Sequence, residues 1–291
     1  MKASRRARRG HSLIELLVSL PFAIIAATAA AMLIVQFARV TRTQSALLAS
    51  VRELRHAHAV LRDDLEPLES RDLVAVTDSL IEVRAHLGVL QLCEQPTAST
   101  VVVAAPARSD DAWVIGVRPG DVVRGYETSS EPAAAPRERT RIVASPPQSV
   151  GRGGCGVFNT LVGRRFRLAF ADSHPPMAAG TPILVQRGVR YQHYRSGNHW
   201  WLGRRTRDGL VWEGLQPAAG PLLPPTQRGM QAVVIDAQGA PAPTDSAVAV
   251  RLLLRTPRRI PLLGTGTATV PADSMLMELV LRARISRRLA Q

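Results

Sequence analysis

One acidic residue lies at the edge of a long apolar segment, and ion pairing is the chemistry to which it is suited. Glu15 lies between a basic stretch, residues 2–9, and residues 16–38, which carry no charge. A carboxylate costs about 2.5–3.5 kcal/mol near the centre of a bilayer and somewhat less near its edge. In hydrocarbon, two opposite charges neutralise one another more cheaply than either remains alone. We therefore expect Glu15 to have a positively charged partner.

Residues that could carry out catalysis do not form a convincing group. Asp63 and Asp64 are neighbouring acids, but the pattern places them on the solvated face of a helix. His174 and His193 have no cysteine or carboxylate at ligand spacing. The glycines within residues 151–156 do not lie between a strand and a helix, so a phosphate-binding loop is not indicated. The sequence predicts a protein that is not an enzyme, with no catalytic residue, metal or cofactor.

The apolar segment is long enough to cross a membrane, because a bilayer needs about 20 apolar residues. The leader before it carries Lys2 and four arginines, and such positive charges stay on the cytoplasmic side. This predicts a single-pass membrane protein with a cytoplasmic N-terminus. Everything after Arg39 would lie on the outer side of the membrane.

Cys93 and Cys155 are the only cysteines of the chain, and both would lie outside the cytoplasm. An even count in an oxidising compartment favours a disulfide. Such a bridge would contribute roughly 4 kcal/mol in the chain-entropy model if the geometry allows it. Two unpaired, buried thiols are the alternative.

A helical pattern continues beyond the apolar segment. Apolar residues recur in steps of three and four through residues 39–68, with His58 in the one gap, and charged residues fall on the opposite side. We expect one helix that leaves the membrane, ends near Pro67 and lays this stripe against an apolar surface. A coiled-coil dimer is the alternative, although three heptads are marginal for one. The stripe consists of Leu47, Val51, Leu54, Leu61, Leu65 and Leu68.

The N-terminus, with the sequence GHSLIE at residues 10–15, resembles that of type IV prepilins and pseudopilins. In that family a short basic leader ends in glycine, a dedicated membrane peptidase cuts after it, and the fifth mature residue is glutamate. The resemblance implies cleavage between Gly10 and His11, N-methylation of His11, and pairing of Glu15 with the N-terminal ammonium of a neighbouring subunit. Family members usually begin with phenylalanine or methionine, and Pro21 is predicted to break the span early.

Two other interpretations of this segment remain. A secretory signal peptide would have a basic start, an apolar middle and small residues such as those at 29–31. Glu15 inside the apolar part and the unbroken helical pattern argue against it. A membrane anchor that is never processed explains the length but leaves Glu15 unexplained.

From Asp72 the pattern changes to a period of two, with turn residues between apolar runs. Residues 73–76 and 80–87, joined at Asp78, predict a hairpin. Short strands without intervening helices predict an antiparallel sheet domain over residues 69–291, and thus an α+β fold with a long helix packed on the sheet. Loops are predicted near 131–156 and 216–229. Further strands are predicted at 100–104, 113–117, 122–126, 141–144, 166–170, 182–186, 189–195, 199–204, 230–235, 247–254 and 276–285.

The later strands resemble one branch of the same family. Residues 189–191 (VRY), followed by 199–202 (HWWL) and two arginines, are similar to a strand pair of larger minor pilins and J-type pseudopilins. This resemblance implies a structural subunit of a type IV pilus or a type II secretion pseudopilus. Its partners would be the prepilin peptidase, the inner membrane and other pilin subunits, bound through the N-terminal helix.

The chain is strongly basic, with a formal net charge of +14. A basic surface attracts nucleic acid, anionic lipid or an acidic partner. Trp200 and Trp201 could stack on bases beside Arg204 and Arg205, which makes a DNA-binding component of an uptake machine the alternative function. Arginine richness from genome composition explains the charge equally well, since Lys2 is the only lysine.

Overall fold

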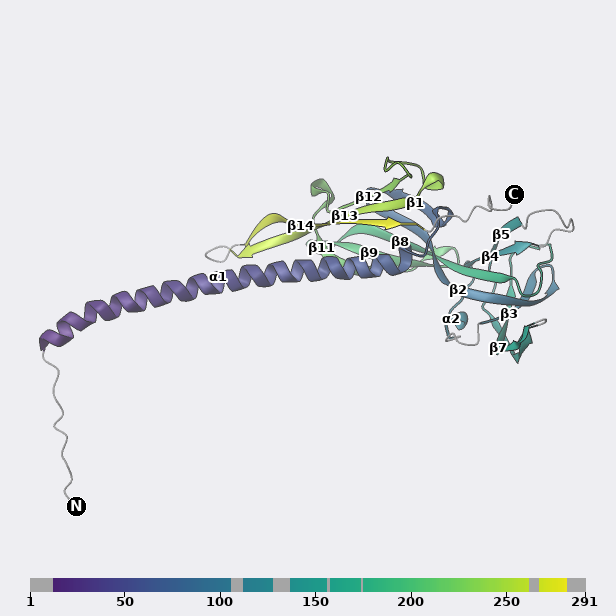
Figure 1. The fold of residues 1–291 in the computed structure, drawn as a ribbon, viewed down its shortest axis with the longest axis horizontal. Helices are drawn as coiled ribbons and strands as arrows, with labels where there is room; N and C mark the ends of the chain where they lie inside the picture. Colours follow the sequence, from purple (N-terminus) through teal and green to yellow (C-terminus); the bar gives the residue numbers. More distant parts are fainter. Residues whose placement is uncertain are drawn as a thin grey trace, which may run out of the picture. The chain divides into compact units, whose positions relative to one another are not determined.

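The computed structural model describes residues 13–105, 112–127, 137–155, 158–173, 175–261 and 267–281. A long helix, a large antiparallel sheet and a three-stranded sheet make up the fold (Figure 1). The predicted α+β fold, with a long helix packed on an antiparallel sheet, is confirmed. The elements are α1 (Leu13–Leu65), η1 (Ser70–Asp72), β1 (Leu73–Thr77), β2 (Leu80–Thr97), β3 (Thr100–Ala104), α2 (Ala112–Ile115), β4 (Val122–Glu127), β5 (Arg137–Ile142), β6 (Gln148–Cys155), β7 (Phe158–Ala169), β8 (Pro182–Ser196), β9 (His199–Asp208), β10 (Val211–Trp212), β11 (Gln216–Leu222), η2 (Pro225–Gln227), β12 (Met230–Ile235), η3 (Thr244–Ser246), β13 (Ala249–Pro261) and β14 (Thr267–Val280).

The helix α1 is continuous over 53 residues and includes Pro21. The predicted break at this residue is therefore wrong, although a proline inside a helix still removes one backbone hydrogen bond. The chain divides within α1 into two compact units, one of residues 1–51 with 258–270 and one of residues 52–257 with 271–291. The last turns of α1 thus belong to the same unit as the large sheet.

The large sheet is antiparallel in every pairing of its described strands. Its main order is β10-β9-β8-β2-β3-β7-β6, with β1 on β2, β11 on β9, and β4 on β8. The smaller sheet has the order β12-β13-β14. Two main hydrophobic cores result: one lies under the end of α1 and involves the small sheet, and the other lies among β2, β3, β4, β7 and β8.

Because β2 contains a bulge, it contributes buried apolar side chains to both hydrophobic cores. His86 pairs with Gln186 and Gly88 pairs with Val185, so β2 has one extra residue here. Because side chains alternate with a period of two, an extra residue exchanges the two faces of the strand beyond it. Odd-numbered residues are accordingly buried before the bulge and even-numbered ones after it: Ile81, Val83 and Ala85, then Leu90 and Leu92.

The strand β8 has β2 on one side and changes its neighbour on the other. Its residues 189–196 pair with β9, whereas 184–186 pair with β4. At the change, the guanidinium of Arg187 donates hydrogen bonds of 2.8 and 2.7 Å to the carboxylate of Asp121, and both side chains are nearly buried. This bidentate, charge-assisted contact pairs the two nearly buried charges at the point where β8 changes its neighbour.

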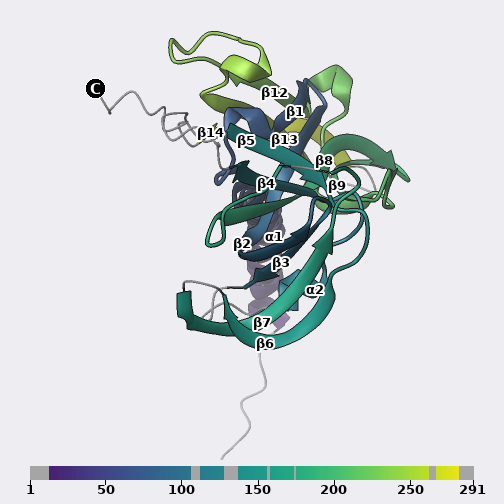
Figure 2. The same ribbon diagram turned by 90° about the vertical axis from the view of Figure 1, so that its right-hand side faces the viewer.

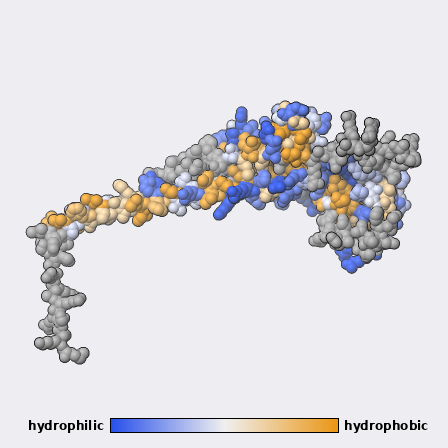
Figure 3. All heavy atoms as spheres, viewed as in Figure 1, coloured by the Kyte–Doolittle hydropathy of each residue, from blue (hydrophilic) through white to orange (hydrophobic). Residues whose placement is uncertain are grey.

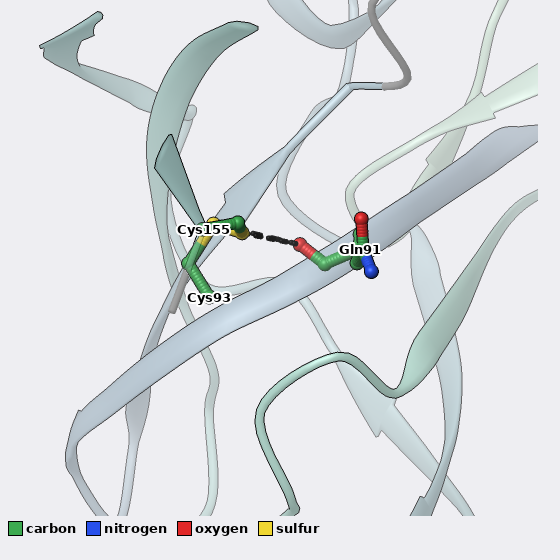
Figure 4. The surroundings of a disulfide bond; sticks show 3 residues. All are labelled: Gln91, Cys93 and Cys155. Carbon is green, nitrogen blue, oxygen red and sulfur yellow. Dashed lines mark hydrogen bonds between the residues drawn. A yellow bond between two sulfur atoms is a disulfide. The ribbon is translucent and has the colours of Figure 1, made fainter. Parts of the chain in front are cut away.

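The far part of the large sheet curls back on itself. β6 is the third neighbour of β2 in the sheet order, yet a disulfide joins Cys93 on β2 to Cys155 on β6, with Cα atoms 4.5 Å apart (Figure 4). Figure 2 shows β6 and β7 following this curve. The two cysteines form a small buried cluster with Val102 and Ala104, so the bridge closes the curl around a core of its own.

Several predicted segments differ from the structure. Residues 113–117, predicted as a strand, overlap the short helix α2, because a short apolar run fits either element. The predicted loop at 131–156 contains β5 and β6 where the structure describes it, and the loop at 216–229 contains β11. Both β6 and β11 are edge strands, where glycine and proline are tolerated because one side has no ladder to complete. A loop-like composition therefore did not exclude a strand.

Candidate assembly helix and its anchor on the sheet

The first half of α1 is apolar on all sides and exposed. The helix from Leu17 is long and apolar enough to cross a membrane once. The exposed large apolar side chains from Leu17 to Phe37 occupy all sides of the helix and are each at least 46 % exposed. Figure 3 shows hydrophobic residues along the face of this part of α1 that is in view. A soluble surface helix would instead have one apolar stripe. This part of α1 is therefore suited to a surrounding of lipid or of other apolar helices.

The residues of the prepilin-like motif fall at the very start of α1. Gly10 and His11 lie outside the described residues. Glu15 belongs to the first turns of α1, where its backbone is helical, but its side chain lies outside the described part. The roles predicted for these three residues therefore stay predictions.

The second half of α1 has the narrower stripe that the sequence indicates. Leu54, Leu61 and Leu65 are buried in the main core, at 5 % exposure or less. The gap in the stripe is filled by Ala57, which is buried, and not by His58, which is half-buried. Each fully buried leucine contributes roughly 1.5–3 kcal/mol, so this stripe holds the end of α1 on the sheet.

A polar contact fixes the position of the helix on that sheet. Asp64 accepts a hydrogen bond of 2.6 Å from the hydroxyl of Tyr191 and one of 2.9 Å from Nε of Arg204. Tyr191 on β8 and Arg204 on β9 are directly opposite one another in the sheet register. The prediction of a solvated Asp64 is thus wrong: its side chain is only 23 % exposed and binds two neighbouring strands.

The charges of this cluster depend on one another. Burial and then the negative charge of Asp64 raise the pKa of Tyr191, whose side chain is fully buried. Burial lowers the pKa of Arg204, but the nearby carboxylate outweighs it and the pKa is raised. At neutral pH the cluster is therefore a neutral phenol beside an ion pair.

A second polar cluster holds the chain where it leaves α1. Asp72 in η1 is 1 % exposed and forms an ion pair of 3.0 Å with Arg124 on β4. It also accepts hydrogen bonds of 2.8 Å from Gln186 and 3.2 Å from His86. Burial raises the pKa of Asp72, but these contacts and the backbone N–H of Glu69 hold it at about 2. The carboxylate thus ties η1 to β2, β4 and β8.

Sequence reasoning did not identify either of these two clusters. Asp64 is more than 120 residues from Tyr191 and Arg204, and Asp72 is more than 50 residues from Arg124 and Gln186, and no local sequence pattern indicates such contacts. A signal was nevertheless present, because Asp64 directly precedes Leu65 and so borders the apolar stripe. Groups of three or more potential metal ligands are absent from the described residues.

Two of the residues predicted to contact nucleic acid, Trp200 and Arg204, are engaged within the protein. Trp200 packs against the main core, and Arg204 is paired with Asp64. Trp212, which was not singled out, lies under the guanidinium groups of Arg190 and Arg205, at 4.3 and 5.3 Å from its ring centre.

In comparisons with known proteins, no family model, curated protein or solved structure matches this chain. Its function is therefore inferred from its own residues.

Proposed function

We propose that this chain is a minor pilin or pseudopilin, a non-enzymatic subunit of a type IV pilus or a type II secretion pseudopilus. The observation that carries the proposal is the start of α1: a single acid, Glu15, lies in its first turns, directly before a stretch of the helix that is apolar and exposed on all sides. A helix of this kind needs lipid before assembly and other apolar helices after it. A filament of packed pilin helices offers both environments in turn.

Each part of the chain has a physical task in this proposal. A prepilin peptidase removes the leader after Gly10, and His11 becomes the new, methylated N-terminus. Glu15 then pairs with the N-terminal ammonium of a neighbour, which avoids the cost of about 2.5–3.5 kcal/mol for an unpaired carboxylate in the membrane. The buried leucine stripe and the contact between Asp64 and Tyr191 attach the sheet domain to the C-terminal end of the same helix.

The test is the substitution Glu15→Ala in the native host. We expect normal processing after Gly10 but a large loss of incorporation, because the N-terminal ammonium of the neighbour would then remain unpaired. An unpaired charge costs about 2.5–3.5 kcal/mol at the centre of a bilayer and less near its edge, so the loss should reach at most about a hundred-fold. Incorporation is measured by immunoblotting of sheared filaments against the membrane fraction. Glu53→Ala is the matched control, because it removes the same group from α1 beyond the apolar segment. Equal incorporation of the two variants would refute the pairing.

The remaining alternative is an unprocessed membrane anchor that carries a β domain. It differs in one measurable property, the N-terminal peptide of the protein purified from its host. The proposal requires a first residue with the mass of methylated His11. A mature chain that retains residues 2–9 would refute processing and favour the simple anchor.

A further inference from the structure

The antiparallel strands β6 and β7 form a strongly basic ribbon at one edge of the large sheet. Their residues, Gln148–Cys155 and Phe158–Ala169, contain four arginines and no aspartate or glutamate. Three of the four side chains are exposed, and the fourth is half-buried. Figure 2 shows strands β6 and β7 at the curled end of the sheet. The arginine ribbon consists of Arg152, Arg164, Arg165 and Arg167 on these strands.

The register of the ribbon places positive charges on both of its faces. Arg152 on β6 is directly opposite Arg164 on β7. Arg165 and Arg167 are two residues apart, so they share the other face. The guanidinium of Arg165 lies over Gly153, whose missing side chain leaves room for it. Positive charge therefore covers the ribbon over about 10 Å of strand β7.

This arrangement is unfavourable without a partner of opposite charge. Like charges directly opposite one another on neighbouring strands destabilise a sheet. Elsewhere in the sheet such charges are compensated: Arg187 pairs with Asp121. Arg190, which lies directly opposite Arg205, pairs with Glu82, and both of these guanidinium groups lie over the ring of Trp212. Among the described residues, the four arginines of the ribbon have no carboxylate within ion-pair distance.

We propose that the arginine ribbon binds the phosphate backbone of nucleic acid without reading its sequence. Guanidinium groups match phosphate oxygens in geometry and charge. A run of arginines without any aspartate or glutamate on either strand is complementary in charge to the repeated phosphates of a nucleic-acid backbone. Charge alone is sufficient for backbone binding.

This inference is independent of the filament proposal and relocates the predicted DNA contact from Trp200 and Trp201 to the opposite edge of the sheet. The disulfide supports it structurally, because Cys155 at the end of β6 is fixed to β2. The ribbon is therefore held in a fixed curve and can present its arginines without a large loss of entropy on binding.

The test uses the full chain in neutral detergent and a labelled 30-base-pair DNA duplex, with binding measured by fluorescence anisotropy. If all four arginines contact phosphates, log K falls with log salt at a slope of about −3.6, so the affinity drops about 150-fold between 50 and 200 mM salt. The double substitution Arg152→Gln and Arg164→Gln should halve the slope and reduce this drop to about 12-fold.

The matched control is the double substitution Arg52→Gln and Arg55→Gln, which removes the same charge from the exposed side of α1. We expect it to leave the salt slope unchanged. A second variant, Arg167→Gln, should lower the slope by about 0.9. Equal effects of the ribbon and helix variants would overturn the proposal, because binding would then follow net charge. Binding to polyglutamate but not to DNA would overturn it in favour of an acidic protein.

Discussion

The hydroxyl of Tyr191 offers a direct test of how α1 is anchored to the sheet. Tyr191→Phe removes the 2.6 Å hydrogen bond to Asp64 and keeps the buried ring. A hydrogen bond to a charged group contributes about 1.5–3 kcal/mol to stability. Arg204 remains paired with the carboxylate, so no charge is left alone. We therefore expect the free energy of unfolding to fall by about 2 kcal/mol.

The assay is thermal unfolding of the full chain in neutral detergent, followed by tryptophan fluorescence. All four tryptophans follow α1 in the sequence, so the signal reports on the sheet domain. The expected loss corresponds to a decrease in Tm of about 4–8 °C for a domain of this size. Tyr194→Phe on the same strand is the control, since its hydroxyl has no hydrogen bond within the described residues, and it should change stability by less than about 0.5 kcal/mol.

A double-mutant cycle identifies the partner. If Tyr191 acts through Asp64, the combination with Asp64→Ala should show a coupling energy of about 1–2 kcal/mol, within the range for residues in contact. Additive effects, or equal losses in Tyr191→Phe and Tyr194→Phe, would refute the contact as the anchor. The apolar stripe of Leu54, Leu61 and Leu65 would then hold the helix by itself.

Two further predictions concern the sheet domain. Replacing Cys93 and Cys155 by serine should lower the free energy of unfolding in urea by about 4 kcal/mol, because the bridge spans 62 residues; equal urea midpoints for the oxidised and reduced wild-type protein would contradict this. Since the folded pKa of Asp72 is about 2, below its ordinary 3.8, its ionised form contributes fully above about pH 5. Stability is lost as the pH falls toward 2, by about 2 kcal/mol. Asp72→Asn should flatten this decline between pH 6 and 2.5, and an unchanged decline would show that other groups cause it.

The sequence predicted the elements whose signals are local and periodic. The stripe from Leu54 to Leu65 follows helical spacing, and the hairpin of β1 and β2 follows from alternation around Asp78. β12 was predicted with its exact bounds, residues 230–235. In each case one strong physical cause, burial of one face, sets the pattern.

Elements whose form depends on the partner that they pair with were not predicted. β6 is a strand because the following strand β7 pairs with it, although the glycines of β6 are typical of a loop. The role of Asp64 depends on Tyr191 and Arg204, more than 120 residues away. The β2 bulge at His86 changes the buried residues from odd-numbered to even-numbered positions midway along the strand. A prediction that assumes a constant period of two cannot include such a change.

The position of Tyr191 has a mechanical consequence. It lies on β8, an interior strand that is hydrogen-bonded to β2 on one side and to β9 on the other. A pulling force on the N-terminal part of α1 would be transmitted by the contact between Asp64 and Tyr191 to β8. The backbone hydrogen bonds of β8 to β2 and to β9 would resist this force together. An edge strand such as β6 has only one neighbour, so its hydrogen bonds could break one after another.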